Sequence, residues 1–506
     1  MLNSNMNELP LSITEQLNNI LQSIAYFVPE TALAILFLLV IITGLVMKKD
    51  AGRFCQLLTL FGLVFVFQRD VQQLYLVLSG PKFLFSNMLL LHHVSIVFKL
   101  VFEVLAFLIV VYIPLDQSLK SHSKGLSDLY AILIAVVFGL HLMAMSVNLL
   151  MIYLAIETVS IGSFLLVAYQ TENRFAVEAG LKYVLFGFAA SAVMLYGMSL
   201  LYAATGQLDI FNGHFLDGLI RVHPVPVSLG IIFVLFGIGF KLSFVPMQFW
   251  VPDVYEGAAT PVVAFLSTLT KIAGFALLTN FLTPFVFFGK WTAFDFRLFF
   301  SIIGIITLIA GNFAAIVQTN IKRMLAYSSI GHTGFGLMAL VTFSQQGISA
   351  LLFYLIVYAF ANIGALMLCS FYAGKNSMLS VEDLRGLGKA YPFAGVCFVV
   401  LLVSLIGLPV SAGFNGKVLV FSSVIDVYRQ NHNSWLLALL ITGAVTTVVS
   451  LFYYFKIPLN LFLKTPHQTG AVIVNQSTTL LILIGFMAAL VILLGIFPSL
   501  LANLVR

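Results

Sequence analysis

Charged residues are scarce in this sequence. Only 9% of its 506 residues are Asp, Glu, Lys or Arg, whereas 61% are hydrophobic and 48 are phenylalanine. Soluble globular proteins carry about a quarter of their residues as charged side chains. The composition therefore excludes a soluble enzyme or binding domain and indicates a polytopic membrane protein surrounded by the lipid bilayer.

Cysteine is also rare, with only Cys55, Cys369 and Cys397 in the chain. They lie far apart in apolar surroundings without C-x-x-C spacing, so neither a disulfide framework nor a zinc or iron–sulfur site is indicated. We interpret them as packing residues. The formal net charge of +6 arises from loops beside the membrane and does not indicate a nucleic-acid partner.

Long apolar segments recur along the chain. A helix needs about 20 apolar residues to cross a hydrocarbon core of about 30 Å, and fourteen segments are candidates, of which the second is short. Their predicted limits are 25–47, 53–68, 88–113, 127–145, 147–170, 175–204, 226–249, 261–288, 297–318, 325–343, 347–373, 393–424, 434–463 and 477–503. The sequence thus predicts an all-α polytopic fold with about fourteen transmembrane helices.

Lysine and arginine in the loops indicate the orientation, because cytoplasmic loops hold the excess of positive residues. Loops after odd-numbered helices carry Lys48, Lys49, Arg53, Lys120, Lys124, Arg174, Lys322, Arg323, Lys375, Arg385, Lys389, Lys456 and Lys464. Loops after even-numbered helices carry Arg69, Lys82, Arg221, Lys290, Arg297 and Arg429. The odd-numbered loops are therefore predicted to be cytoplasmic, with both termini on the outer, periplasmic side of a bacterial inner membrane.

Four ionisable residues lie deep inside predicted helices, where a charge costs at least ~2.5–3.5 kcal/mol. Glu157 and Lys271 each stand about ten residues into a helix, or about 15 Å deep. Lys241 and Lys417 each share an apolar segment with a proline. From such depths a side chain cannot reach the membrane surface by snorkelling, so we predict that these four side chains bind protons.

Other ionisable residues have two interpretations. Lys182, four residues after Glu178, is either a proton-binding group or half of an ordinary helical ion pair. Lys99 and Glu103 have the same spacing near the start of a helix, where we interpret Lys99 as a side chain that snorkels to the headgroups. His332 is either a proton carrier or a hydrogen-bonded core histidine.

Two prolines predict broken helices. Pro246 removes an amide hydrogen bond one turn after Lys241. Pro409 interrupts an apolar run, residues 393–424, that is too long to cross the membrane as one straight helix. Broken backbone at membrane depth is tolerated only where protein or water satisfies it, so both breaks predict buried polar cavities.

The two breaks fall five helices apart, in the seventh and twelfth helices. An odd offset reverses direction across the membrane, so helices 4–8 and 9–13 are predicted to be inverted repeats. The corresponding division of the chain is 1–126, 127–288, 289–463 and 464–506. Buried groups that change protonation when a partner moves predict a lateral proton path through Glu157, Lys182 or Lys241, Lys271, His332 and Lys417.

Three sequence blocks resemble one family closely. They are FKLSFVPMQFWVPDVYEGAATPVVAFLSTLTKIAGFALL at 240–278, NIKRMLAYSSIGHTGFGLMAL at 320–340 and GLPVSAGFNGKVLVF at 407–421. These blocks resemble the antiporter-like N-type membrane subunits of the proton-pumping NADH:quinone oxidoreductase, respiratory complex I. The resemblance extends from about residue 28 to the end.

The resemblance implies the fourteen helices, the inverted repeats and one proton-translocation unit. It implies that Glu157 pairs with Lys241, that Lys271 is the central connecting lysine, and that Lys417 belongs to the exit half. Lys182 and His332 match further lysine and histidine positions of the family. The family often has histidine where this chain has Gln248, so a proton-carrying role at that position does not follow.

The resemblance further implies no redox cofactor on this chain: NADH, FMN, the iron–sulfur clusters and the quinone belong to partner subunits. The expected partners are other membrane subunits of complex I, including an M-like subunit and small membrane subunits. Two other functions remain as alternatives to a proton-translocating subunit of complex I. The first is a subunit of a multisubunit cation/proton antiporter, and the second is a structural spacer between membrane subunits.

Overall fold

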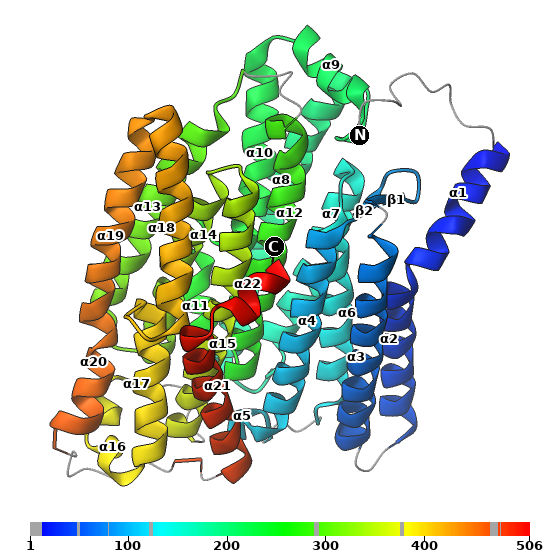
Figure 1. The fold of residues 1–506 in the computed structure, drawn as a ribbon. Coiled ribbons are helices and arrows are strands. Elements are labelled where there is room, and N and C mark those ends of the chain that lie inside the picture. The colour runs from blue at the N-terminus through cyan, green and yellow to red at the C-terminus, as the bar shows by residue number, and fades with distance from the viewer. Residues whose placement is uncertain are drawn as a thin grey trace.

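The computed structural model describes residues 13–47, 51–78, 80–120, 125–287, 293–374, 379–465, 474–475 and 477–505. Lys48, Lys49, Lys124, Lys290 and Lys375, which entered the orientation prediction, lie outside these residues, as does the proposed boundary at 288/289. Figure 1 shows a bundle of roughly parallel helices, with a short β-hairpin and α9 at one end.

The first part of the chain contains α1 (Ile13–Tyr26), α2 (Val28–Val46), α3 (Ala51–Leu76), β1 (Lys82–Leu84), β2 (Leu89–Leu91), α4 (His93–Tyr112), η1 (Ile113–Leu115), α5 (Gln117–Lys120), α6 (Ser127–Met145), α7 (Leu149–Val167), α8 (Arg174–Thr205), α9 (Gly213–Arg221), α10 (Pro224–Leu242), α11 (Trp250–Gly257) and α12 (Thr260–Phe287). The rest contains α13 (Phe296–Ile316), α14 (Ile321–Leu340), α15 (Gln345–Ala373), η2 (Glu382–Leu384), α16 (Leu387–Ala390), α17 (Pro392–Ile406), α18 (Ala412–Asn431), α19 (Ser434–Tyr454), α20 (Lys456–Pro458), η3 (Leu459–Leu463), α21 (Thr478–Ile496) and α22 (Ser499–Val505). The strands β1 and β2 pair antiparallel.

The predicted all-α membrane fold is confirmed. Within the described residues, twelve helices are long and apolar enough to cross a membrane, or thirteen if a bent pair counts as one span. Two of the fourteen predicted segments explain the difference. The helix α14 contains several Ser, Thr, Gly and His residues, and the segment 393–424 is divided between α17 and the more polar α18.

Several predicted limits were wrong, two of them for a clear physical reason. The second span, predicted as 53–68, is the 26-residue helix α3, because polar residues such as Asp70 and Gln73 are buried inside the bundle and do not end the helix. The third span was predicted to begin at residue 88, but residues 89–91 form strand β2 and α4 begins at His93. The paired hairpin satisfies its own backbone groups and therefore competes with helix there.

Two long helices form the centre of the bundle. In α12 and α15 every residue of the most apolar stretch is buried, whereas in α2, α3 and α8 only a third or less of that stretch is buried. Both central helices contact each other, and α14 contacts both of them. Lys271 on α12 and His332 on α14 are therefore both buried within the bundle.

Both predicted helix breaks are present. The helix α10 ends at Leu242, Ser243 adopts a left-handed conformation (φ 58°), and α11 begins only at Trp250, beyond Pro246. Similarly, α17 ends at Ile406 and α18 begins at Ala412, with Pro409 between them. Each break frees backbone carbonyls in the interior of the bundle, and these need new hydrogen-bond donors.

Candidate functional site

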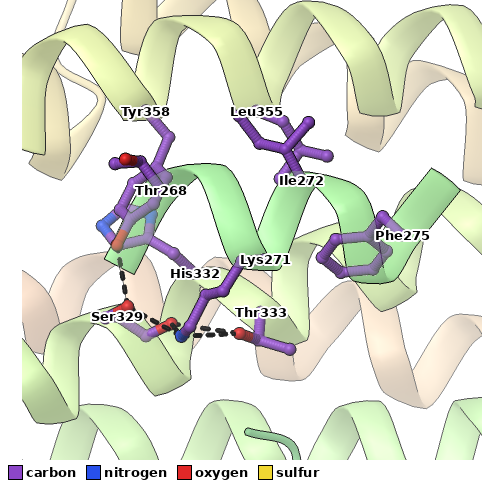
Figure 2. Close-up of a pocket in the computed structure, with 9 residues that line it drawn as sticks. All are labelled: Thr268, Lys271, Ile272, Phe275, Ser329, His332, Thr333, Leu355 and Tyr358. Atoms are coloured by element: carbon purple, nitrogen blue, oxygen red, sulfur yellow. Dashed lines mark hydrogen bonds between the residues drawn. The ribbon is translucent and has the colours of Figure 1, made fainter. Parts of the chain in front are cut away.

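Lys271 lies in the middle of α12 and points at α14 (Figure 2). Its Nζ donates hydrogen bonds to the carbonyl oxygen of Ser329 at 2.8 Å, to Ser329 Oγ at 2.7 Å and to Thr333 Oγ1 at 3.1 Å. Ser329 and Thr333 are four residues apart, so they share one face of α14. Lys271 is thus held by three oxygens of a single neighbouring helix.

A small cavity adjoins this lysine, between α12, α14 and α15 (Figure 2). It has space for about one water molecule. Its lining includes Lys271, Ser329, His332, Thr333 and Tyr358. Tyr358 donates a hydrogen bond to Ser329 Oγ at 2.8 Å, so polar groups from three helices meet at this position.

His332 connects α14 to α15 and α19. One ring nitrogen, Nδ1, lies 2.6 Å from the hydroxyl of Tyr354, and the other, Nε2, lies 3.3 Å from the hydroxyl of Tyr454. Its ring also packs on Tyr358, with centroids 4.6 Å apart. No hydrogen bond among the described residues joins His332 directly to Ser329. The hydrogen bonds around Lys271 and those around His332 are therefore two separate groups that lie side by side.

Lys417 lies near the start of α18, just after the second helix break. Its Nζ donates a hydrogen bond of 2.7 Å to the carbonyl oxygen of Ile406. Ile406 is the last helical residue before that break. The ammonium nitrogen also lies 4.5 Å from the centre of the Phe335 ring. The lysine thus satisfies a carbonyl that the break has freed.

Lys241 occupies the last turn of α10, just before the first break. It is 1% exposed, and its Nζ has no hydrogen-bond partner within the described part of the chain. Glu157 on α7 interacts with it electrostatically, but its carboxyl group is only partly buried, unlike the three lysines, and accepts a hydrogen bond from Ser191. The structure therefore brings the two residues into one region without a direct ion pair.

The end of α10 is linked to Lys271. Thr333 Oγ1 donates to the carbonyl oxygen of Leu242 at 2.9 Å while it accepts from Lys271. The indole nitrogen of Trp250 donates to the carbonyl oxygen of Phe240 at 3.1 Å. Two freed carbonyls of the first break thus have side-chain donors, and one donor also contacts the central lysine.

Lys182 is placed differently from the other lysines. Its side chain is 39% exposed, and Nζ pairs with Glu178 at 2.8 Å and with Asp253 at 2.9 Å. Arg323 at the start of α14 also pairs with Asp253, at 2.8 Å. Burial raises the pKa of Asp253, but the hydrogen bonds from Lys182 and Arg323 outweigh it, so the pKa lies below its ordinary value.

The arrangement is chemically suited to proton transfer. Lys241, Lys271 and Lys417 are buried, and no described carboxylate forms an ion pair with any of them. A buried charge without a counter-charge is costly, so the protonation of such a group depends strongly on its surroundings. The hydroxyl and imidazole groups beside Lys271 and His332 can both donate and accept hydrogen bonds.

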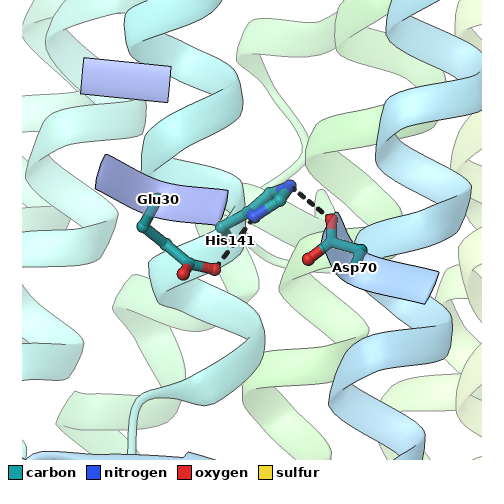
Figure 3. A group of neighbouring side chains, drawn as sticks. All are labelled: Glu30, Asp70 and His141. Carbon is teal, nitrogen blue, oxygen red and sulfur yellow. Dashed lines mark hydrogen bonds and ion pairs between the residues drawn. The ribbon is translucent and has the colours of Figure 1, made fainter. Parts of the chain in front are cut away.

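Sequence reasoning missed a second group of buried ionisable residues. Glu30 on α2, Asp70 on α3, and Lys99 and Glu103 on α4 converge on His141 of α6, and all are 0–1% exposed (part of the group is drawn in Figure 3). The snorkelling interpretation of Lys99 was wrong. Its ammonium group is buried against Glu30 at 2.6 Å and Asp70 at 2.8 Å.

The signals for this group were weak in the sequence. Asp70 follows Arg69 and resembles a loop residue, and Glu30 stands at the start of an apolar run beside Pro29. His141 is a single polar residue in a long apolar helix. Nothing in their spacing along the chain shows that four helices bring them together.

The described groups do not form a metal site. Glu30, Asp70 and His141 bring candidate atoms within 4.8 Å of one another, but the ammonium group of Lys99 contacts both carboxylates. It occupies the place that a cation would take. These residues are therefore not metal ligands.

Comparison with known proteins identifies relatives along nearly the whole chain. Residues 146–450 match the family described as NADH:quinone oxidoreductase/Mrp antiporter, TM. The chain is 35% identical over 498 residues to NADH-quinone oxidoreductase subunit N of Chlorobium chlorochromatii, which covers 96% of this chain and 94% of that protein.

Solved structures show the same architecture. A chain in respiratory complex I from Thermus thermophilus is 29% identical and has a TM-score of 0.76, over 94% of this chain and 98% of that one. A chain in the Mrp complex from Dietzia sp. has a TM-score of 0.79 over 94% and 96% of the two chains. At 17% identity, the second similarity shows a common fold alone.

Proposed function

The chain belongs to the NADH:quinone oxidoreductase/Mrp antiporter family of membrane subunits, and on this premise we propose that it is a proton-translocating subunit of an NADH:quinone oxidoreductase. The observation that carries the proposal is the placement of Lys271. It is buried at the centre of the bundle, hydrogen-bonded to α14 and linked through Thr333 to the broken end of α10. A structural spacer has no need for a charge at that position.

The residues have distinct roles in this proposal. Lys241 and Glu157 hold a proton in the first half of the path, and Ser191 positions the Glu157 carboxyl. Lys271 receives the proton at the centre. His332 and Lys417 carry it through the second half, with hydroxyl groups such as that of Tyr354 between them.

Pro246 and Pro409 allow these groups to change partners. Where a helix is broken, a backbone carbonyl can exchange one donor for another without loss of a whole helical turn. Lys417 holds the carbonyl oxygen of Ile406, and Thr333 holds that of Leu242. A shift of α14 or α18 therefore alters the surroundings of a lysine, and this is how we propose that a signal from outside the chain moves a proton.

Lys182 is proposed to act at the surface of the path. It shares Asp253 with Arg323, so it links α8 and α11 to the start of α14. Lys182 thus forms an ordinary helical ion pair with Glu178 and also contacts α11, the helix that follows the first break, through Asp253. Gln248 lies within the first break, between α10 and α11, with Oε1 buried and without a partner among the described residues, and we propose that it orients water there.

The proposal extends to the assembly. We propose that NADH, FMN, iron–sulfur clusters and quinone act on partner subunits, and that other membrane subunits, including an M-like one, contact this chain. We also propose inverted repeats, with the chain divided at 126, 288 and 463. The location is proposed as a bacterial inner membrane with both termini on the periplasmic side.

Purification of the intact assembly in mild detergent tests this function. The expected result is that a tag on this chain co-purifies subunits that contain iron–sulfur clusters and oxidise NADH. The Mrp complex shares the fold, so a multisubunit cation/proton antiporter is the second candidate. Recovery of only membrane subunits, without NADH oxidation, would contradict the first proposal and favour the second.

A further inference from the structure

Five buried ionisable residues, which we call the N-terminal cluster, lie outside the proton path described above. The cluster consists of Glu30, Asp70, Lys99, Glu103 and His141, supplied by α2, α3, α4 and α6. Glu30 is in the first turn of α2, and His141 is one turn from the end of α6. The cluster therefore lies toward the end of the bundle that carries the β1–β2 hairpin (Figure 1).

Lys99 balances two of the carboxylates. Its Nζ lies 2.6 Å from Glu30 Oε1 and 2.8 Å from Asp70 Oδ1. Its third close contact is a hydrogen bond that it donates to Gln73 Oε1 at 2.6 Å. An ammonium group has three donors, so Lys99 has none left for Glu103.

His141 faces three carboxylates, of which Asp70 is the farthest, with its Oδ2 4.0 Å from Nε2. Its Nδ1 is 3.2 Å from Glu30 Oε1, and its Nε2 is 3.0 Å from Glu103 Oε1 (the contact with Glu30 is drawn in Figure 3). A neutral imidazole donates from only one nitrogen and would turn a lone pair toward the other carboxylate, whereas an imidazolium donates from both. Both ring nitrogens therefore face carboxylate oxygens, and the positively charged imidazolium is the form that these neighbours favour.

The charges still do not balance. Three carboxylates face one ammonium and one imidazolium, which leaves one negative charge in a fully buried site. No other ionisable group within the described chain forms an ion pair with the cluster. The carboxylate oxygens Glu30 Oε2, Asp70 Oδ2 and Glu103 Oε2 have no hydrogen-bond partner there. One more proton would remove the charge and convert an unpartnered acceptor into a neutral carboxylic acid.

Glu103 is the group best placed to hold that proton. Glu30 and Asp70 are both fixed by Lys99, whereas Glu103 pairs with His141 alone among the described residues. A carboxylate next to fewer cations gains most from being neutralised. Among the described residues, the charged groups that act on Glu103 are His141, Asp70 and Lys99, which are all members of the cluster.

We propose that the N-terminal cluster is a second proton-binding site, in which the carboxylate of Glu103 takes up one proton from water and releases it again. The helices α4 and α6, which carry Lys99, Glu103 and His141, also pack against α12, the helix of Lys271. Gln73 connects Lys99 to the carbonyl oxygen of Tyr26 at the junction of α1 and α2. Binding of a proton here does not depend on the function proposed for the lysine path.

Infrared difference spectroscopy of the intact, purified assembly tests the proposal. Spectra at successive pH values show the carbonyl stretch of a protonated carboxyl group, which shifts in heavy water. The informative variant is Glu103→Gln, which keeps the shape and removes the site of protonation. The matched control is Glu382→Gln, because Glu382 is an exposed carboxylate paired with Arg385. A second variant, Glu103→Asp, keeps a carboxyl group if the amide prevents folding.

The expected result is a pH-dependent carboxyl band in the wild type and in Glu382→Gln that is absent in Glu103→Gln and displaced in Glu103→Asp. An unchanged band in both Glu103 variants would overturn the proposal. A band that appears or disappears with sodium or divalent cations at constant pH would also overturn it, because the cluster would then bind a metal ion and not a proton.

Discussion

Lys417, just after the second helix break, donates a hydrogen bond of 2.7 Å to the carbonyl oxygen of Ile406, just before it. A side chain that carries charge thus also closes the gap in its own broken helix. Release of the proton from Lys417 replaces a charge-assisted hydrogen bond across that gap by a weaker one from a neutral amine, so protonation and local backbone conformation are coupled. The same principle applies at the first break, where Thr333 joins Leu242 to Lys271.

Gly407→Ala tests the coupling at the second break. Gly407 has φ 84°, and an added Cβ would lie 2.7 Å from Cδ of Lys417. We expect loss of most proton pumping, together with backbone strain of about 1–3 kcal/mol. Pumping is measured in inverted vesicles by fluorescence quenching.

Gly206→Ala is the matched control. Gly206 has φ 66° at the end of α8, but an added Cβ meets nothing within 4 Å. It imposes similar strain without contacting a lysine. Equal pumping in both variants, at equal assembly, would contradict a role for the position of Lys417.

Thr333→Val tests the link between α10 and Lys271. The change keeps the shape and removes the oxygen that joins Leu242 to Lys271, which should cost about 1 kcal/mol of stability and slow pumping several-fold. The control is Thr279→Val on α12, where the hydroxyl has Phe275 of its own helix as its one hydrogen-bond partner among the described residues. Pumping rates normalised to assembled protein compare the two variants. An equal effect of both changes would refute a specific role for the link between Leu242 and Lys271.

Tyr354→Phe tests the contact with His332, which is shorter than the contact from Tyr454. We expect lower pumping and an altered pH profile of NADH-driven activity, since one partner of the imidazole is lost. Tyr372→Phe on the same helix is the control, because the Tyr372 hydroxyl has no partner among the described residues. If the two variants have the same pH profile as the wild type, His332 is only a packing residue.

Asp253→Asn tests the ion pairs of α11 with Lys182 and Arg323. The pKa of Asp253 lies below its ordinary value, so the pairs stabilise the structure above the unfolded pKa of about 3.9 and lose this effect as pH falls through the folded pKa. In the wild type, hydrogen exchange of residues 250–257, corrected for intrinsic rates, should therefore accelerate as pH falls below about 4. The variant should exchange faster at neutral pH and lack that step, whereas Glu382→Gln should behave as the wild type.

Much of the fold and part of the site could be predicted from the sequence. Apolar runs of membrane length identify most helices, and the cost of a charge inside them singles out Lys241, Lys271 and Lys417, which are all buried. Pro246 and Pro409 identify the breaks because proline cannot supply the helical hydrogen bond. These signals are local, since each depends on a residue and its neighbours along the chain.

The remainder depends on contacts between distant segments. Tyr354 and Tyr454 reach His332 from different helices, and aromatic residues are too common in this chain for their role to be visible. The N-terminal cluster was missed because Glu30, Asp70 and His141 look unremarkable one at a time. The exposure of Lys182 depends on which face of α8 is packed, and the sequence does not specify that face.

The central claim is that the ionisable residues of the first half move protons, and pumping by Lys241→Ala and Glu157→Gln variants in inverted vesicles tests it most directly. NADH oxidation and subunit content are measured in the same preparation, with Lys464→Ala, at an exposed position, as the control. We predict that both variants assemble, pump at least several-fold more slowly and lose coupled quinone reduction, while the control is unchanged. Normal pumping by both Lys241→Ala and Glu157→Gln would contradict the account.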